Sequence, residues 1–183
     1  MLWFVLKYKL IMPRRTSPIG LTTTHLTELG RQLLPHFSGV TSCDTIDHIF
    51  PHFDVTRSCI INLLEKQHKR GGHWVALFYD ANKHHLYYWD PYGFPPTNAF
   101  ILEFLTRAPA KVTCYDHRVQ SVWSVYCGFF VMAFLIHKEV NLSTKAFFQV
   151  FDEQHHNLND DIVVLFIKAY IEQHCPQQLA CLS

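Results

Sequence analysis

The first regularly spaced apolar residues in the chain are leucines. Three of them recur three and four residues apart and would share one face of a helix: Leu26, Leu29 and Leu33. Thr24 precedes them as a candidate amino-terminal cap, and Pro35 ends the pattern. We therefore predict a short helix here, followed by a loop over residues 36–47.

Strand-like patterns occupy the middle of the chain. The mostly apolar run SCIINLL at residues 58–64 predicts a strand. Two aromatic-rich runs follow, HWVALFYD at residues 73–80 and HLYYWD at residues 85–90, and the short segment between them contains an asparagine. Two β-rich runs on either side of such a turn predict a hairpin.

The second half of the chain has mostly helical patterns. We predict a helix from a Thr97 cap to Arg107, a strand over Lys111–Val119, a buried helix over Gly128–Ile136, and two helices near Thr144–Phe151 and Asp161–Gln173. The third of these elements is expected to be buried on all sides because every residue in it is apolar or glycine. Asn159 is a candidate cap for the last helix. The order of elements predicts an α+β domain with helices grouped around a small sheet.

Composition excludes several classes of protein. The chain has 183 residues, of which 49% are apolar and 17% are charged, so it is neither disordered nor highly acidic. Lys and Arg number 16 against 15 Asp and Glu, and this balance argues against a general phosphate-binding surface. A chain of this length is typical of one domain that folds without a metal or a disulfide.

The amino-terminal residues differ from the rest of the chain. Residues 1–12, MLWFVLKYKLIM, are apolar but too few to span a bilayer, and they lack the basic start and the cleavage site of a signal peptide. We expect residues 1–24 to be an amino-terminal extension and residues 25–183 to form a single domain. We assign no function to residues 1–11.

The six cysteines have the spacing of neither a metal site nor a disulfide scaffold. None belongs to a Cys-x-x-Cys pair, and no His/Cys cluster has zinc-finger spacing. The pairs His84-His85 and His155-His156 lack a complete ligand set, so no metal site is predicted. We interpret the cysteines as reduced and expect an intracellular protein.

The predicted hairpin brings a histidine and an aspartate together. His73 begins one strand, and Asp90 ends the other. If Ala81 lies opposite His84, then His73 and Asp90 are diagonal neighbours on one face, about 7–8 Å apart along the backbone and within reach of their side chains. Asp80 lies on the other face of its strand from His73. A register slip of one residue would separate the pair.

Cys127 lies at the start of the predicted buried helix. Unpaired N–H groups and the positive end of the helix dipole favour a thiolate at that position. An imidazole beside it would form a thiolate–imidazolium pair near neutral pH, and Asp90 would orient that ring and stabilise its charge. Gln120, seven residues earlier, is a candidate donor to an oxyanion, together with the Cys127 backbone N–H.

Each of these residues also has an ordinary structural interpretation. A cysteine at a helix start is commonly a small core residue, and a histidine in a strand is more often structural. Asp90 before Pro91 is a good turn residue, and Gln120 could simply hydrogen-bond a loop. The combination of four residues carries the functional hypothesis.

The segments that contain these residues resemble a known family. They are GHWVA at residues 72–76, WDPYGF at residues 89–94, VQ at residues 119–120 and CGFF at residues 127–130. Together they resemble the adenovirus protease (adenain) family, which is related to the proteases that cleave ubiquitin-like modifiers. The order His, acid, Gln, Cys matches, as do the steps of 17 residues from His73 to Asp90 and of 7 residues from Gln120 to Cys127.

A further motif narrows the resemblance, which covers roughly residues 25–140. The segment FSGV at residues 37–40, with Ser42 and Asp44, is similar to the amino-terminal motif of adenain-like proteases in Maverick/Polinton elements and related DNA viruses. The resemblance implies a cysteine endopeptidase that matures virion proteins, on a papain-like fold with permuted chain order. The protein would then work in the host nucleus or the virion.

The resemblance also implies a role for each residue of the motifs. Cys127 would be the nucleophile, His73 the general base, Asp90 the orienting acid and Gln120 an oxyanion donor. The family cleaves near glycine, which implies a narrow substrate cleft. The residues that would suit such a cleft are Gly72, Trp74 and Gly128.

The sequence departs from the family in its acid, at the peptide-linked cysteine and in its charge. Asp90 takes the place of the Glu of the adenovirus enzymes, as in the modifier proteases. Adenain is activated by DNA and by a viral peptide that is disulfide-linked to a cysteine upstream of its oxyanion glutamine. Gapless spacing puts Pro109 at that position here, and the nearest cysteine is Cys114, which argues against peptide activation.

Charge gives a second argument about cofactors and partners. The net charge of +1 argues against a DNA cofactor. The residues that could supply a local basic patch are Arg14, Arg15, Lys66, Lys69 and Arg70. The sequence thus requires no cofactor, although the resemblance allows DNA or an activating peptide. It predicts a protein substrate as the partner and no membrane, and DNA as a partner has only the resemblance in its support.

Two alternative functions remain open from the sequence. A deconjugating protease for ubiquitin-like modifiers would use the same four residues, and the FSGV motif favours the virion-maturation protease over it. A catalytically silent domesticated element would act as a binding module. The presence of all four candidate residues argues against that reading.

Overall fold

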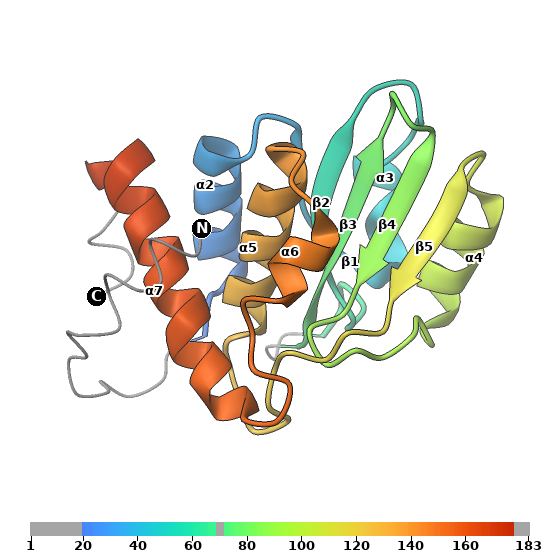
Figure 1. Cartoon of the computed structure of the whole chain (residues 1–183). Coiled ribbons are helices and arrows are strands. Elements are labelled where there is room, and N and C mark those ends of the chain that lie inside the picture. The colour runs from blue at the N-terminus through green and yellow to red at the C-terminus, as the bar shows by residue number, and fades with distance from the viewer. Residues whose placement is uncertain (1–19, 69–71, 178–183) are drawn as a thin grey trace.

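A five-stranded mixed sheet forms the centre of the molecule. The computed structural model describes residues 20–68 and 72–177 (Figure 1). The strands lie side by side in chain order and are β1 (Phe37–Ser42), β2 (Arg57–Asn62), β3 (Trp74–Asp80), β4 (His85–Trp89) and β5 (Lys111–Tyr115). The pairs β1–β2 and β4–β5 are parallel, whereas β3 is antiparallel to both of its neighbours.

Helices cover both faces of this sheet. On one side lie α2 (Thr23–Leu33), α5 (Cys127–Glu139), α6 (Thr144–Phe148) and α7 (His156–His174), and on the other lie α3 (Ile46–Ile49) and α4 (Ala99–Arg107) (Figure 1). A 3₁₀ turn, η1 (Cys43–Thr45), precedes α3. The predicted α+β class, a small mixed sheet with helices around it, is confirmed.

The two faces of the sheet contribute to two separate hydrophobic clusters. In β3, Ala76 and Phe78 join the cluster under α2, α5 and α7, whereas Val75, Leu77 and Tyr79 join the cluster under α3 and α4. Because successive side chains of a strand point to opposite faces, both faces of β3 are apolar. This is why the sequence of β3 reads as a continuous apolar run.

Helix α5 is buried along almost its whole length. Its residues from Cys127 to His137 are all buried, and it packs against β3, α7 and α2. The prediction of a helix buried on all sides is therefore confirmed. Its position also means that the first turn of α5 meets the sheet next to the β3–β4 hairpin.

Two predicted helix caps differ from those in the structure. The hydroxyl of Thr22, rather than Thr24, accepts a hydrogen bond from the His25 N–H, so α2 begins at Thr23. Asn98, rather than Thr97, caps α4. Neighbouring residues in both segments can serve as caps, so the pattern alone does not choose between them.

Asn159 does not cap the last helix. Helix α7 begins at His156, five residues before the predicted start, so Asn159 lies within it. Its side-chain amide instead donates to the backbone oxygens of Val119 and Asp152 and accepts from the Asp152 N–H. Asn159 thereby ties α7 to the segment before α5.

Strand β1 lies in the region predicted to be a loop. It pairs with β2 in parallel, with an irregularity between Phe37 and Gly39, and Gly39 has a φ of 140°. Its half-buried residues show no alternation of apolar and polar side chains, so the strand has no local signal. Strand β5 is shorter than predicted because its partner β4 ends at Trp89, opposite Tyr115.

The predicted amino-terminal extension is described only in part. Residues 1–19, including the apolar residues 1–12, lie outside the described residues. Of the remainder, Leu21 is buried and Thr23 begins α2. Within residues 20–68 and 72–177, no helix is both long enough and apolar enough to cross a membrane.

Candidate active site

The register of the hairpin brings His73 and Asp90 together. Asp80 pairs with His85 and Ala76 with Trp89, which is the predicted register. The imidazole Nε2 of His73 lies 2.6 Å from the carboxylate Oδ1 of Asp90. The Asp90 side chain is only 3% exposed, and the same oxygen accepts a bond from the Tyr92 N–H. The carboxylate is thus fixed in place and directed at the ring.

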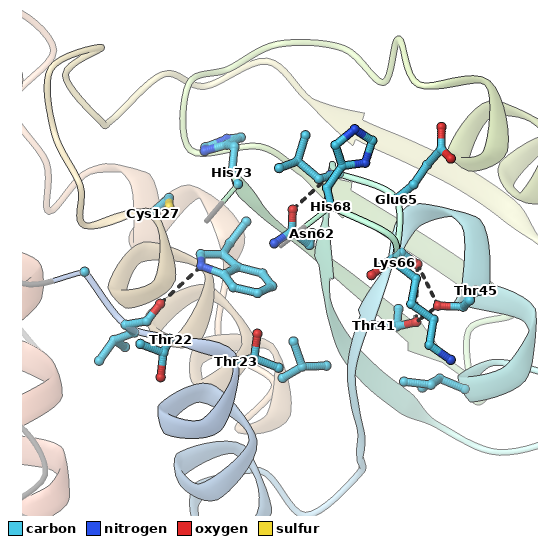
Figure 2. Close-up of a pocket in the computed structure, with 18 of the residues that line it drawn as sticks. Thr22, Thr23, Thr41, Thr45, Asn62, Glu65, Lys66, His68, His73 and Cys127 are labelled. Atoms are coloured by element: carbon cyan, nitrogen blue, oxygen red, sulfur yellow. Dashed lines mark hydrogen bonds between the residues drawn. The ribbon is translucent and has the colours of Figure 1, made fainter. Parts of the chain in front are cut away.

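Cys127 is the first residue of α5 and lies near His73 (Figure 2). It is buried, and it lies close enough to His73 to raise the pKa of that imidazole. Because Nε2 of His73 bonds Asp90, the ring has Nδ1 available for the thiol. The positive end of the α5 dipole favours negative charge on the sulfur.

The environment of His73 favours its protonated form. Burial lowers the pKa of the imidazole, but the hydrogen bond to Asp90, the charge of Asp90 and the nearby Cys127 raise it to about 9. The ring also stacks on Tyr92, with ring centres 4.3 Å apart. At neutral pH the arrangement therefore supports an imidazolium between a carboxylate and a sulfur.

Gln120 is bonded to the turn that leads into α5. Its side chain is fully buried, and its Nε2 donates to the backbone oxygen and to the hydroxyl of Ser124 at 3.1 and 3.2 Å. Its Oε1 is buried without a hydrogen-bond partner. A primary amide has two N–H bonds, so donation to an oxyanion would require one of them to leave Ser124.

A cleft of about 1070 Å³ opens beside Cys127 and His73 (Figure 2). It is bounded by the start of α2, the end of β1 with η1, and the segment that follows β2. Figure 2 shows Cys127 and His73 toward one side and Thr41, Thr45 and Lys66 toward the other. An extended peptide laid along such a cleft would pass the thiol.

Two of the three predicted cleft residues line it. Trp74 is 6% exposed, and its Nε1 donates to the Leu21 oxygen, so it is both a wall of the cleft and part of the core. At Gly72, a Cβ would lie 2.2 Å from the Asn62 Oδ1, so only glycine fits there without a shift. The structure places Gly128 elsewhere, since it packs against Leu21 and the Leu26 side chain.

Other residues of the site were not identified from the sequence. Tyr92 and Ser124 line the cleft, and the Tyr92 hydroxyl donates to the Ser124 oxygen. Tyr92 belongs to the WDPYGF segment, which was the available signal. No signal in the sequence pointed to Ser124, because its partner Asp160 is 36 residues away in the chain.

The described residues offer no arrangement for a metal ion. Among residues 20–68 and 72–177, no group of three or more His, Cys, Asp and Glu side chains could hold one. The described cysteines are free, and they are Cys43, Cys59, Cys114, Cys127 and Cys175. Of the predicted basic patch, Lys66 lines the cleft, and the other four residues lie outside the described part.

The geometry suits nucleophilic chemistry at a carbonyl group. A thiol at a helix start, an imidazole beside it and a buried carboxylate bonded to that ring are the parts that activate a cysteine. The carboxylate fixes the ring orientation, and the ring can move a proton to and from the sulfur. The cleft supplies a place for a substrate beside the sulfur.

Comparison with known sequences gives a relative among the adenovirus proteins. No family model matches the chain. The chain is 31% identical over 134 residues to the "Protease" of Porcine adenovirus A serotype 3. The match covers 64% of this chain and spans 63% of the length of that relative. It confirms the resemblance to adenovirus protease that the motifs predict.

Comparison with solved structures identifies a shared fold. A crystal structure of an ASFV protease has a TM-score of 0.56 at 17% identity, covering 81% of this chain and 68% of that one. A structure of the SUMO protease Ulp1 has a TM-score of 0.49 at 14% identity, covering 90% and 83%. The first of these likenesses shows that the chain has the fold of the viral protease.

Proposed function

We propose that this protein is a cysteine endopeptidase in which Cys127 is the nucleophile, His73 the acid and base, and Asp90 the group that orients His73. One observation carries the proposal: the imidazole of His73 bonds the Asp90 carboxylate at 2.6 Å and lies close enough to Cys127 for that residue to raise its pKa, at the wall of a large cleft. The match to an adenovirus protease supports it.

The reaction would proceed through a covalent intermediate. The Cys127 thiolate attacks the peptide carbonyl, and the resulting oxyanion lies near the N–H at the start of α5. Protonated His73 then gives its proton to the departing amine as the C–N bond breaks, which leaves a thioester. His73 next takes a proton from water, the hydroxide attacks the thioester, and the thiolate leaves. The Asp90 carboxylate stabilises the imidazolium throughout.

The second oxyanion donor in this proposal is Gln120. Its amide is held under the loop that precedes Cys127 by hydrogen bonds to Ser124. An oxyanion is a stronger acceptor than a neutral carbonyl or hydroxyl oxygen, so its formation favours exchange of one N–H from Ser124 to the substrate. That contact would then exist mainly in the transition state, where it accelerates the reaction.

The substrates would be capsid or other virion precursor proteins, cut near glycine. Gly72 supports this, because its lack of a side chain keeps the wall beside His73 open to a close backbone approach. The proposal requires no cofactor. The resemblance would allow DNA or an activating peptide, but the charge balance argues against DNA, and Pro109 at the position of the peptide-linked cysteine argues against the peptide. The site of action would be the host nucleus or the virion.

The test is cleavage of a library of glycine-containing peptides by the purified full chain, beside Cys127→Ala, with and without DNA. We expect cleavage that is lost in the variant. A fusion that ends in a ubiquitin-like modifier serves as the second substrate, and its cleavage without cleavage of the peptides would favour a deconjugating protease. Absence of both cleavage and Cys127 labelling by a thiol-reactive electrophile would indicate a binding module.

A further inference from the structure

The backbone oxygen of Ser124 accepts hydrogen bonds from two side chains. The Gln120 Nε2 donates to it at 3.1 Å, and the Tyr92 hydroxyl donates to it at 3.4 Å. A carbonyl oxygen has two lone pairs, so it can accept both bonds at once. The longer bond, from Tyr92, is the weaker of the two. This single oxygen thus connects the candidate oxyanion donor with the loop that follows Asp90.

Tyr92 is held in place by its backbone and by its ring. Its N–H donates to the Asp90 Oδ1 at 2.8 Å, and its ring stacks on His73 with ring centres 4.3 Å apart. Burial and the nearby charges of Cys127 and Asp90 raise the pKa of its hydroxyl, so at neutral pH the hydroxyl keeps the proton that it donates. The hydroxyl is therefore a fixed donor beside the Ser124 oxygen.

The hydroxyl of Ser124 is held from another side. It donates to Asp160 on α7, and it accepts from the Tyr126 N–H as well as from Gln120. Tyr92 lines the cleft, whereas Asp160 is not one of the residues that line it. The Gln120 N–H that bonds the carbonyl oxygen is therefore the one on the cleft side. The N–H that bonds the hydroxyl is the one on the α7 side.

We infer that the Tyr92 hydroxyl is a positioning group for Gln120. It keeps the Ser124 carbonyl oxygen bonded when Gln120 turns its cleft-side N–H from that oxygen to the oxyanion. This inference rests on the proposed function, in which Gln120 donates to the oxyanion. Without the hydroxyl, release of the N–H would leave the carbonyl oxygen without either donor. That loss would arise only when the oxyanion forms, so it would raise the barrier of the reaction rather than weaken substrate binding.

Tyr92→Phe tests the inference because it removes the hydroxyl and keeps the ring that stacks on His73. We expect kcat for a cleaved peptide to fall about tenfold, the scale of one carbonyl left without its hydrogen bond, with KM within about twofold. The apparent pKa on the alkaline side of kcat/KM should stay the same, because the contacts of His73 remain. Alkylation of Cys127 by iodoacetamide forms no oxyanion and should keep its rate. An equal loss in alkylation would show a general disturbance of the site and would overturn the inference.

Tyr79→Phe is the matched control variant. The Tyr79 hydroxyl also donates to a backbone oxygen, that of Phe53 at 2.9 Å, and it lies near the turn end of the hairpin. We expect this variant to leave kcat within about twofold of the wild-type value.

The Gln120→Ala background shows whether the effect of Tyr92 passes through Gln120. Tyr92→Phe should slow that variant no further, because no N–H is left to exchange. A loss that persists in Gln120→Ala would overturn the inference. A kcat for Tyr92→Phe equal to that of the wild-type protein would also overturn it, and both results would leave the proposed protease intact.

A binding measurement separates this inference from the proposed function. The Cys127 sulfur can add to the carbonyl carbon of a peptide aldehyde that ends in Gly–Gly. The S–C bond forms, the C=O π bond opens, and the oxygen takes the proton of the His73 imidazolium. This oxygen lies where the oxyanion of a cleaved peptide would lie. Protection of Cys127 from iodoacetamide measures the dissociation constant of the adduct.

We expect this dissociation constant to rise several-fold in Tyr92→Phe and to stay unchanged in Tyr79→Phe. In the Gln120→Ala background, Tyr92→Phe should not change it. This pattern without cleavage of any peptide would contradict the peptidase and retain the role of Tyr92. Equal dissociation constants in the wild-type protein and Tyr92→Phe would overturn the role of Tyr92 alone. Absence of both cleavage and adduct formation would overturn both.

Discussion

The hydroxyl of Ser124 donates a 2.8 Å hydrogen bond to the carboxylate of Asp160, which lies on α7, 36 residues further along the chain. A serine hydroxyl has one hydrogen, so a hydroxyl that donates to Asp160 can only accept from its other neighbours. Those neighbours are the Tyr126 N–H and the Gln120 amide. Helix α7 thereby acts together with the Ser124 backbone oxygen to turn the Gln120 amide nitrogen toward Ser124.

This relationship predicts that Ser124→Ala impairs catalysis through Gln120. The variant removes one of the two oxygens that hold the Gln120 Nε2 and leaves the Ser124 backbone oxygen as the other, so the amide is held less firmly in the orientation that donates to the oxyanion. We expect kcat to fall about tenfold, the scale of one lost hydrogen bond, with a smaller change in KM. Steady-state hydrolysis of a cleaved peptide measures both constants.

Two controls show whether the effect passes through Gln120. Ser124→Thr keeps a hydroxyl and should retain most of the activity. Ser124→Ala combined with Gln120→Ala should be no slower than Gln120→Ala alone, because the two residues act as one unit. Independent, multiplicative losses in the double variant would contradict the prediction. Alkylation of Cys127 by iodoacetamide forms no oxyanion and should keep its rate in Ser124→Ala.

Asp90→Asn should abolish most of the activity without unfolding the protein. The amide can occupy the space of the carboxylate, but it cannot stabilise the imidazolium and can favour the wrong tautomer of His73. We expect kcat to fall by a factor of about 10² to 10⁴. Peptide hydrolysis measures the loss, and thermal unfolding verifies the fold.

Asp80→Asn is the matched control for that variant. Asp80 lies at the turn end of the same hairpin and forms an ion pair with Lys83. Loss of this ion pair should leave kcat within a factor of about two of the wild-type value, because surface ion pairs contribute little to stability. A similar loss of activity in both variants would show that hairpin stability, rather than the orientation of His73, is responsible.

The raised pKa of His73 predicts a dependence of stability on pH. The pKa of this imidazole rises from 6.5 to about 9 on folding, so the folded protein holds the proton more tightly than the unfolded chain does. The stabilisation is fully present below pH 6.5 and is lost as the pH rises through about 9. We expect the free energy of unfolding in urea to decline over this window more in the wild-type protein than in His73→Asn.

Activity should follow the same titration. Above about pH 9 the imidazolium loses its proton, and neutral His73 can no longer protonate the departing amine. The prediction is that kcat/KM falls on the alkaline side with an apparent pKa near that value. For the stability prediction, a parallel loss of stability in the wild-type protein and His73→Asn between pH 6.5 and 9 would show that the proton on His73 does not stabilise the folded protein.

The parts of the fold that the sequence predicts are those with local causes. The β3–β4 hairpin and its register follow from two apolar runs and the four residues between them, and α5 follows from an unbroken apolar run. Strand β1 was missed because it depends on parallel pairing with β2, about twenty residues later, and carries no alternation of its own. Nothing within residues 36–47 signals that pairing.

The same distinction separates the parts of the site. The residues that a hairpin register and a helix start place could be predicted, and they are His73, Asp90 and Cys127. The contacts of Gln120 could not, since they depend on where α7 packs and on the bond between Ser124 and Asp160. Gly128 was placed in the cleft from the motif alone, whereas the packing of α5 on α2 turns it toward Leu21.

Gly72→Ala should narrow the cleft beside His73 and destabilise the protein. A Cβ at this position would lie 2.2 Å from the Asn62 Oδ1 and 2.8 Å from the Leu64 Cγ. Asn62 cannot move away freely, because its Oδ1 accepts a hydrogen bond from the Leu64 N–H. We expect a loss of about 1–3 kcal/mol in the free energy of unfolding in urea and a higher KM for peptides.

Asn62→Ala tests the cause of that effect, because it removes the oxygen that the new methyl group would meet. Combined with Gly72→Ala, it should restore part of the stability and of the KM relative to Gly72→Ala, after allowance for its own effect as a single variant. If the effects of the two substitutions on the free energy of unfolding simply add, the new methyl group is accommodated by shifts of atoms other than those of Asn62. Equal KM values for Gly72→Ala and the wild-type protein would mean that the substrate does not pass close to this wall, and the glycine would then serve only the packing of the segment after β2.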